Sequence, residues 1–290
     1  MTAMHRTIPA LLLVLVPHIG IYVSGSRRWL GAGFARFQPT ELAKLALVVF
    51  AADLLTRREA DLHDWRATVR PLLVVVLVLA GLVFLEPDLD STVLLGVIAV
   101  GILLVGGARL RDLATVGVGG MSIATIAALT APYRRARLLT FLHPSASAAN
   151  GGYQIVQSLI ALGSGGVAGV GLGAGRSKWL FLPNAHTDFI FAVIGEELGL
   201  IGTFAVLALF AAFAVLGVRT ARRAPDRFGM LLAAGITVWV VAQAAVNIGG
   251  VVGLLPVSGV PLPFVSFGGS ALVFTMIAAG ILANVARQAR

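Results

Sequence analysis

Residues 188–217 read DFIFAVIGEELGLIGTFAVLALFAAFAVLG, and this run decides the fold class. It exceeds the roughly 20 apolar residues that a helix needs to cross a hydrocarbon core of about 30 Å. Its apolar residues are continuous, whereas a membrane barrel strand would alternate and need only about ten residues. The run therefore predicts a membrane-spanning helix with Asp188 at its start.

Seven further runs are long enough, or nearly so, to span as helices: 8–24, 38–56, 71–86, 91–107, 111–131, 228–253 and 264–286. The chain of 290 residues is 58% hydrophobic and only 12% charged, about half the charge of a soluble domain, and its mean hydropathy is +0.94. No A-x-A-like cleavage site follows the first run, which we interpret as a retained span. We expect an all-α polytopic membrane protein with about eight helices in a single domain, residues 1–290.

The positive charges predict an orientation in the membrane. If the N-terminus is cytoplasmic and every run crosses, thirteen of the 22 Lys and Arg residues lie inside, eight lie outside, and Lys44 lies within a span. Cytoplasmic loops carry such an excess, so both termini are expected in the cytoplasm, with Asp188 and a large loop over 132–187 outside. The arginines are spread along membrane borders, which argues for contact with membrane lipids and against nucleic acid.

Two glycine-rich or proline-rich segments lie on the predicted outer side. The stretch 163–175 lacks both the preceding strand and the Walker lysine of a nucleotide loop. Its glycines suit a non-helical backbone that runs close to helix ends. The turn from Pro256 to Ser270 combines Pro261 and Pro263 with two adjacent glycines, which favours a rigid connection that frames a site.

Several charged residues need partners or functions if these spans are correct. Asp188 would lose hydration at the mouth of a membrane segment. It could act chemically, or Asp188 or Thr187 could cap the helix that follows. Glu41 and Lys44 lie three residues apart on one helix face and can pair, as a structural ion pair or beside substrate. Asp88 is predicted to cap the span after it.

Four motifs resemble a known family when they are taken together and in order. They are Ser26-Arg27-Arg28-Trp29 with FQPTELAK at 37–44, Glu86-Pro87-Asp88-Leu89, the run from Tyr153-Gln154 through LPNAHTDFIF at 182–191 to GEELG at 195–199, and 247–270. The chain resembles the SEDS (shape, elongation, division and sporulation) family of bacterial cell-wall proteins, represented by FtsW and RodA. Residues 182–188 and 247–270 are more similar to the FtsW branch.

The resemblance also exposes differences. Family members have ten spans, so this chain of eight lacks the first two, and its first run corresponds to the family's third. Asp90 replaces a usual Gly, Phe267 a usual Tyr, and Gly175 a common Ser. None of these differences affects Asp188, but each alters local geometry near a motif.

The resemblance implies a peptidoglycan glycosyltransferase that polymerises lipid II at the outer face of the bacterial cytoplasmic membrane, in cell division. Asp188 is then expected to be the general base, and partial burial would raise its pKa. The expected diphosphate-binding cations are Arg28, Lys44, Arg176 and Lys178. Supporting roles are expected for Gln38, Glu41, Glu196, Glu197 and Ser270. Glu196 or Glu197 would pair with Lys44 or orient the helix that carries Asp188.

The same resemblance implies binding partners and leaves two alternative functions open. The expected partners are lipid II, the nascent glycan strand, a class B penicillin-binding protein, and divisome or elongasome components. A divalent cation, Mg²⁺ or Mn²⁺, could assist, and no ligand set for it is assigned. A lipid II flippase is an alternative because the bundle has intramembrane charges and broken connections. A non-catalytic scaffold for the penicillin-binding protein is another. The candidate polar groups lie mainly on one face, which favours the enzyme.

Overall fold

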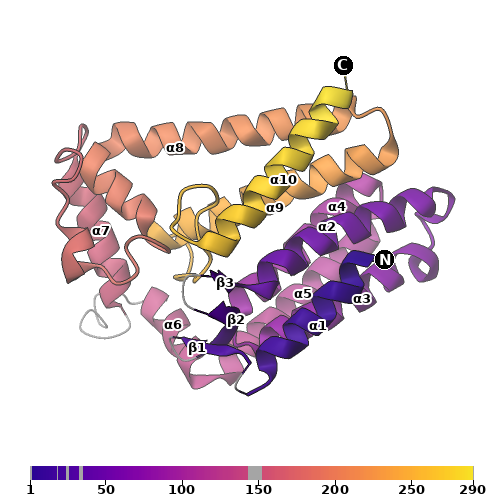
Figure 1. Cartoon of the computed structure of the whole chain (residues 1–290), viewed down its shortest axis with the longest axis horizontal. Coiled ribbons are helices and arrows are strands. Elements are labelled where there is room, and N and C mark those ends of the chain that lie inside the picture. The colour runs from indigo at the N-terminus through magenta and orange to yellow at the C-terminus, as the bar shows by residue number, and fades with distance from the viewer. Residues whose placement is uncertain (1, 18, 24–25, 33–34, 143–151, 290) are drawn as a thin grey trace. The chain divides into compact units, whose positions relative to one another are not determined.

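The computed structural model describes residues 2–17, 19–23, 26–32, 35–142 and 152–289 (Figure 1). Six of the helices in this part of the chain are long and apolar enough to cross a membrane. They cover Trp65–Leu85, Leu89–Gly106, Leu110–Thr130, Ile190–Arg223, Arg227–Val251 and Gly269–Gln288. The prediction of an all-α multi-pass membrane protein is therefore confirmed. The total of eight spans stays a prediction.

The chain forms two compact units, which are described separately. The first unit contains residues 1–124, 214–240 and 269–290, and the second contains 125–213 and 241–268. Three helices contribute residues to both units: α5 (Leu110–Thr130), α8 (Ile190–Arg223) and α9 (Arg227–Val251).

The first unit is built around α2. Its complete helices are α1 (Thr2–Leu15), α2 (Pro39–Arg57), α3 (Arg70–Leu85), α4 (Leu89–Gly106) and α10 (Gly269–Gln288). A short 3₁₀ turn, η1 (Glu59–Asp61), and a π turn, η2 (Trp65–Val69), precede α3. Helix α2 contacts α1, α3, α4 and α10. A Cβ on Gly235 of α9 would lie 2.8 Å from side-chain atoms of Ile102 and Val48. Glycine therefore permits close packing between α9, α4 and α2.

An antiparallel sheet precedes α2 and was not predicted. Its strands are β1 (Ile21–Val23), β2 (Ser26–Ala32) and β3 (Ala35–Phe37), in that spatial order. The predicted span over 8–24 is wrong in its second half, because α1 ends at Leu15. Pro17 has no amide donor to continue a helix. The chain then turns so tightly that a Cβ on Gly20 would lie 2.0 Å from the carbonyl oxygen of Val14.

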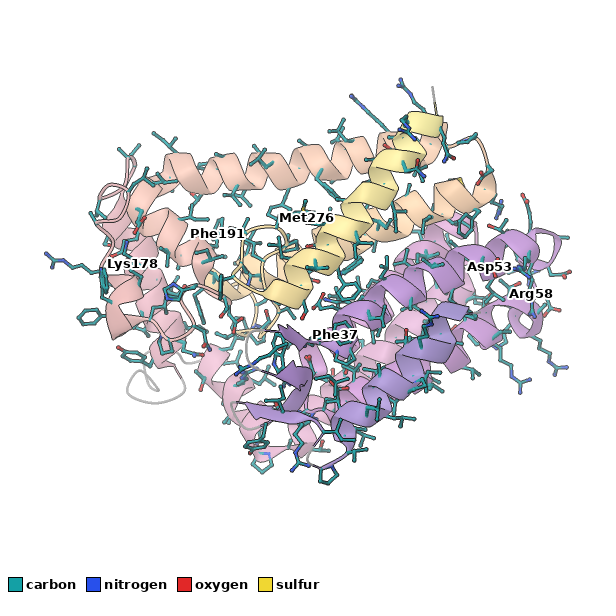
Figure 2. The ribbon with its side chains drawn as sticks, in the orientation of Figure 1. Phe37, Asp53, Arg58, Lys178, Phe191 and Met276 are labelled. Atoms are coloured by element: carbon teal, nitrogen blue, oxygen red, sulfur yellow. The ribbon has the colours of Figure 1, made fainter. Side chains whose placement is uncertain are left out.

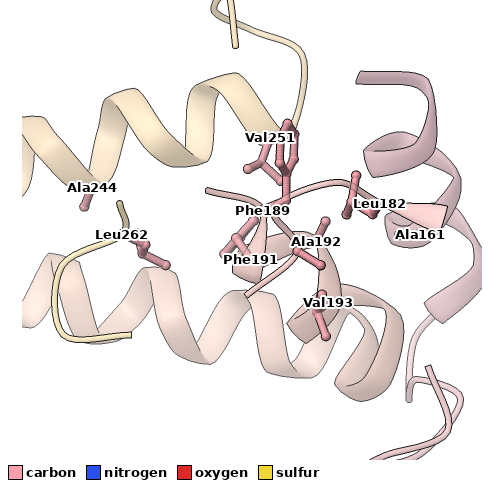
Figure 3. Close-up of a cluster of buried hydrophobic side chains, with 10 residues drawn as sticks. Ala161, Leu182, Phe189, Phe191, Ala192, Val193, Ala244, Val251 and Leu262 are labelled. Carbon is pink, nitrogen blue, oxygen red and sulfur yellow. The ribbon is translucent and has the colours of Figure 1, made fainter. Parts of the chain in front are cut away.

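The second unit contains much of the segment that was predicted as a large loop. That segment includes α6 (Pro132–Leu142), α7 (Tyr153–Gly165) and a π turn, η4 (Ser177–Phe181). Helix α7 buries Ile155, Ser158 and Ala161, whose three-residue spacing places them on one face. Figure 3 shows the core of this unit, where Phe189 and Phe191 lie among buried residues of α7, α9 and the segment after α9.

Helix α8 is interrupted at Gly199, where φ is 64° and ψ is −157°. The glycine-rich segment satisfies the backbone groups that the break frees. The amides of Leu200 and Ile201 donate to the carbonyls of Gly166 and Val167 at 3.0 and 3.3 Å. In return, the amides of residues 170 and 171 donate to the carbonyls of residues 196 and 197. The prediction that these glycines run close to a helix is confirmed.

Candidate active site

Asp188 lies in a turn immediately before α8, which begins at Ile190. Asn184 has a φ of 58°, a left-handed conformation that asparagine tolerates better than most residues. The Asn184 carbonyl accepts from the amides of Thr187, Asp188 and Phe189 at 3.1, 3.1 and 3.3 Å. Phe189 is buried and the Asp188 side chain is half-buried. The turn thus holds a carboxylate at the start of an apolar helix, and its capping role stays a prediction.

The segment 247–267 contacts this turn from the other side. The carbonyl of His186 accepts from the Phe267 amide at 2.9 Å, and that of Thr187 accepts from Ser266 Oγ at 2.5 Å. The Asp188 carbonyl accepts from Asn247 Nδ2 at 2.8 Å. Asn247 and Ser266 were not among the predicted site residues, although both lie in the fourth motif. Their placement agrees with the predicted framing role of the turn from Pro256.

Glu196 binds the backbone that carries the predicted cations. Its Oε1 accepts from the Arg176 amide at 2.9 Å, and its Oε2 accepts from the Ser177 amide at 3.1 Å. Glu196 is only 5% exposed, whereas the Arg176 side chain is exposed. Glu196 lies in α8, the helix that follows the predicted base, so it fixes the Arg176 backbone to that helix.

Glu197 binds the same loop through a cation. Its Oε1 lies 2.6 Å from Lys178 Nζ, and its Oε2 accepts from the Gly173 amide at 3.0 Å. Lys178 Nζ also donates to the Gly173 carbonyl at 2.8 Å. Figure 2 labels Lys178 on this segment, beside α7. Pairing of Glu196 or Glu197 with Lys44 was one of two expected roles for these glutamates. In the structure Glu197 pairs with Lys178, and Lys44 pairs with Glu41.

Lys44 belongs to the first unit, where it pairs with Glu41. Lys44 Nζ lies 2.7 Å from Glu41 Oε1, and both side chains are buried. The same Nζ lies 5.4 Å from the ring centroid of Trp239. The predicted pairing is confirmed. Glu41 Oε2 is buried and has no hydrogen-bond partner among the described residues, so this carboxylate depends on Lys44 for charge compensation.

Arg28 joins β2 to the turn between α3 and α4. Its Nε donates to the Glu86 carbonyl at 3.1 Å, and its Nη2 donates to the Pro87 carbonyl at 2.5 Å. Its Nη1 lies 4.0 Å from Asp88 Oδ2. Asp88 also accepts from the Ser91 amide at 3.1 Å, which confirms its predicted capping role. Arg28 therefore has a structural function in the first unit.

The Glu86 side chain is buried beside this turn. Its Oε2 accepts from Thr40 Oγ1 at 3.3 Å, while Oε1 has no partner among the described residues. The pKa of Glu86 is raised to about 8, chiefly by burial and then by the neighbouring Asp88 carboxylate, against opposing effects of Thr40 and Arg28. Desolvation disfavours the charged form. Glu86 is therefore a largely protonated carboxyl at neutral pH.

Gln38 and Ser270 bring the first and fourth motifs together within the first unit. The Gln38 amide donates to Ser270 Oγ at 3.1 Å, and this hydroxyl donates to the Arg36 carbonyl at 2.9 Å. The rings of Phe37, labelled in Figure 2, and Phe274 lie 5.7 Å apart beside them. The two predicted supporting residues thus connect β3 to the start of α10.

The candidate residues therefore divide between the units. The second unit brings together Asp188, Arg176, Lys178, Glu196 and Glu197, and the first contains Arg28, Gln38, Glu41, Lys44 and Ser270. Among the described residues, no three His, Asp or Glu side chains gather as a metal site.

Comparison with known proteins supports the resemblance seen in the sequence. The profile of the FtsW, RodA and SpoVE family of cell cycle proteins matches residues 2–290. A probable peptidoglycan glycosyltransferase FtsW of Nitrosococcus halophilus is 45% identical over 285 residues, covering 97% of this chain and 73% of that protein. Stage V sporulation protein E of Bacillus subtilis is 41% identical over 281 residues, covering 97% of this chain and 76% of that protein.

Two solved structures are similar over nearly the whole chain. One belongs to a peptidoglycan synthase complex whose polymerization and crosslinking are structurally coordinated. It has a TM-score of 0.81 at 28% identity and covers 99% of this chain and 80% of that one. The rod shape determining protein RodA of Thermus thermophilus has a TM-score of 0.71 at 26% identity and covers 99% of this chain and 77% of that one.

Proposed function

Because this chain belongs to the FtsW, RodA and SpoVE family of cell cycle proteins, we propose that it is a peptidoglycan glycosyltransferase that polymerises lipid II in cell division. Its relative in Nitrosococcus halophilus is named a probable peptidoglycan glycosyltransferase. The position of Asp188 is the observation that carries the proposal. A half-buried carboxylate stands at the start of an apolar helix, and the three consecutive backbone carbonyls of 186–188 are hydrogen-bonded to one other segment.

Asp188 acts as the general base in the proposed reaction. A hydroxyl of the acceptor sugar attacks the anomeric carbon of the donor, and its proton passes to the Asp188 carboxylate. The new bond joins the acceptor oxygen to the anomeric carbon. The bond between that carbon and the diphosphate oxygen breaks, and the lipid diphosphate leaves with the electron pair. Partial removal of the carboxylate from water strengthens it as a base.

Cationic side chains stabilise the leaving diphosphate in this proposal. Arg176 and Lys178 belong to the same unit as Asp188, and their backbone or side-chain groups are held by Glu196 and Glu197. Arginine can form two parallel hydrogen bonds to phosphate oxygens, and fixed positive charge lowers the barrier as negative charge develops. Diphosphate binding by Arg28 and Lys44 stays a prediction, in addition to their structural contacts.

The proposed reaction takes place on the outer leaflet, with both termini in the cytoplasm. The excess of Lys and Arg in the segments assigned to the cytoplasm supports this orientation. A class B penicillin-binding protein is the proposed partner, since a similar solved chain belongs to a complex that couples polymerization and crosslinking. These 290 residues contain no Ser-x-x-Lys motif, so the proposed crosslinking activity is assigned to the partner.

Purified protein tests the function when it is mixed with lipid II, a class B penicillin-binding protein and Mg²⁺. We expect the wild type to form glycan polymer and Asp188→Asn to form none while still folding and binding its partner. Asp226→Asn is the matched control, because Asp226 also precedes a helix and accepts from the Gly229 amide at 2.6 Å. Asparagine retains this capping ability, so the control should polymerise at the wild-type rate.

The other outcomes distinguish the alternatives. Full polymerisation by Asp188→Asn would exclude the proposed base. Movement of labelled lipid II between leaflets without polymer would indicate a flippase. Stimulation of the partner without polymer or lipid movement would indicate a scaffold. Repeating the assay with a chelator tests the predicted divalent cation: loss of polymer that Mg²⁺ or Mn²⁺ restores would support it.

A further inference from the structure

Three consecutive carbonyls define the geometry of the Asp188 turn. Those of His186, Thr187 and Asp188 accept from Phe267, Ser266 and Asn247, respectively. Two donors are side chains that lie 79 and 59 residues away in the sequence. The Asp188 amide also donates to the Asn184 carbonyl at 3.1 Å. The peptide groups on both sides of Asp188 are therefore hydrogen-bonded.

The Asn247 side chain is buried, and both of its described hydrogen bonds go to backbone carbonyls. It is 1% exposed, and its Nδ2 donates to the carbonyls of Asp188 at 2.8 Å and Val260 at 2.9 Å. These two bonds fix which end of the amide is nitrogen. Its Oδ1 is buried without a partner among the described residues, at a typical cost of about 1–3 kcal/mol. Asn247 therefore binds two backbone carbonyls although its own carbonyl oxygen gains no hydrogen bond from the described residues. This arrangement indicates that its function is to hold those two carbonyls.

Ser266 connects the same turn to the segment after α9. Its Oγ donates to the Thr187 carbonyl and accepts from the Leu262 amide at 2.7 Å. Ser266 is 5% exposed. Only a group that donates and accepts can make both bonds, and a hydroxyl does so. An alanine at this position would leave the buried Leu262 amide and the partly buried Thr187 carbonyl each without this partner.

We propose that Asn247 and Ser266 are positioning residues that hold the Asp188 carboxylate in register with the acceptor hydroxyl. This inference rests on the proposed catalytic role of Asp188. Asn247 contacts the backbone of Asp188, and Ser266 contacts the backbone of Thr187. They therefore act by fixing the backbone position from which the Asp188 side chain extends. A displacement of a reacting group by about 1 Å can reduce a rate by about 10²-fold. We call Asn247 and Ser266, with their bonds to the Asp188 turn, the clamp. The clamp should therefore affect kcat more than the binding of substrate.

Ser266→Ala and Asn247→Ala test the clamp in the polymerisation assay with the partner protein. For each folded variant we expect kcat to fall at least about tenfold, with the KM for lipid II within about twofold of wild type. Ser258→Ala is the matched control. Ser258 is a buried serine of the same segment whose Oγ has no hydrogen-bond partner among the described residues. Its removal should leave kcat unchanged.

Hydrogen exchange provides a readout that does not depend on activity. Amides of residues 184–190 should exchange faster in Ser266→Ala and Asn247→Ala than in wild type or Ser258→Ala. Ser266→Ala removes one hydroxyl and keeps the inference testable if Asn247→Ala does not fold. Unchanged kcat in the folded variants overturns the proposal, as does a raised KM with unchanged kcat. If Asp188→Asn remains active while Ser266→Ala and Asn247→Ala show faster exchange, the proposed catalytic role of Asp188 is wrong, although the clamp does hold the turn.

Discussion

Lys178 Nζ lies 2.6 Å from Glu197 Oε1, so a predicted diphosphate-binding cation has a carboxylate partner within its own unit. The exposed fractions of the two side chains are 21% and 13%, and the same Nζ donates to the Gly173 carbonyl. The lysine thus binds the glycine-rich segment to α8. The structural function of Lys178 can be separated from its proposed electrostatic function by comparing variants of Lys178 with variants of Glu197.

Lys178→Ala and Glu197→Gln should lower thermal stability by similar amounts, because each breaks the same ion pair. We expect an interaction energy on the order of 1 kcal/mol in a double-mutant cycle. Only Lys178→Ala also removes the proposed cation, so its kcat/KM for lipid II should fall about tenfold below that of Glu197→Gln. Equal activities of the two folded variants would mean that Lys178 has a structural role alone.

Lys44→Met should destabilise the protein by about 3–5 kcal/mol, because it leaves the buried Glu41 carboxylate without its cation. The double variant Glu41→Gln, Lys44→Met should recover much of this loss, since it buries no charge. Thermal unfolding in detergent measures both effects. If Lys44 also contacts substrate, the stabilised double variant will still fail to polymerise lipid II. Recovered activity would assign the pair a structural role.

The stability of the protein should depend on pH through Glu86. Its pKa is raised from 4.5 to about 8 in the folded state, so the folded chain retains a proton that the unfolded chain has released between these values. Stability from this group is fully present below pH 4.5 and is lost as pH rises through about 8. Melting temperatures of Glu86→Gln should decline less between pH 5 and pH 8.5 than those of wild type.

An exposed glutamate provides the control for that measurement. Glu59 has a side chain that is 61% exposed and pairs with Arg227 at 2.8 Å. Glu59→Gln should retain the pH dependence of wild type across the same range. Parallel melting curves for wild type and Glu86→Gln would contradict the assignment of the effect to Glu86.

Gly199→Ala should disrupt the junction between α8 and the glycine-rich segment. The backbone at Gly199 has a conformation open essentially to glycine alone, which costs other residues about 1–3 kcal/mol. A Cβ there would also lie 2.4 Å from the Gly169 amide nitrogen. Gly163→Ala is the matched control, since a Cβ at Gly163 of α7 meets nothing within 4 Å. We expect a lower melting temperature for Gly199→Ala only. Equal melting temperatures would exclude this packing constraint.

Local rules predicted much of the fold and some of the site. The apolar runs predicted helices because backbone groups in lipid must be satisfied within the segment. The pairing of Glu41 with Lys44 and the capping by Asp88 are contacts over three residues, which a helix or its first turn dictates. The family motifs also identified Asp188 and the cations as candidates. Their partners were not apparent, because Lys178 pairs across nineteen residues.

Composition, apolar runs and motifs were enough to predict a helical membrane protein of a cell-wall family and to locate its unusual charges. The three-dimensional contacts were needed to show that residues 21–37 include a sheet, that Arg28 binds the turn at Glu86, and that Asn247 and Ser266 bind the Asp188 turn. The difference has a physical origin. Apolar burial follows the short periods of a helix, whereas these hydrogen bonds join residues 58 to 79 positions apart, whose proximity depends on how the helices pack.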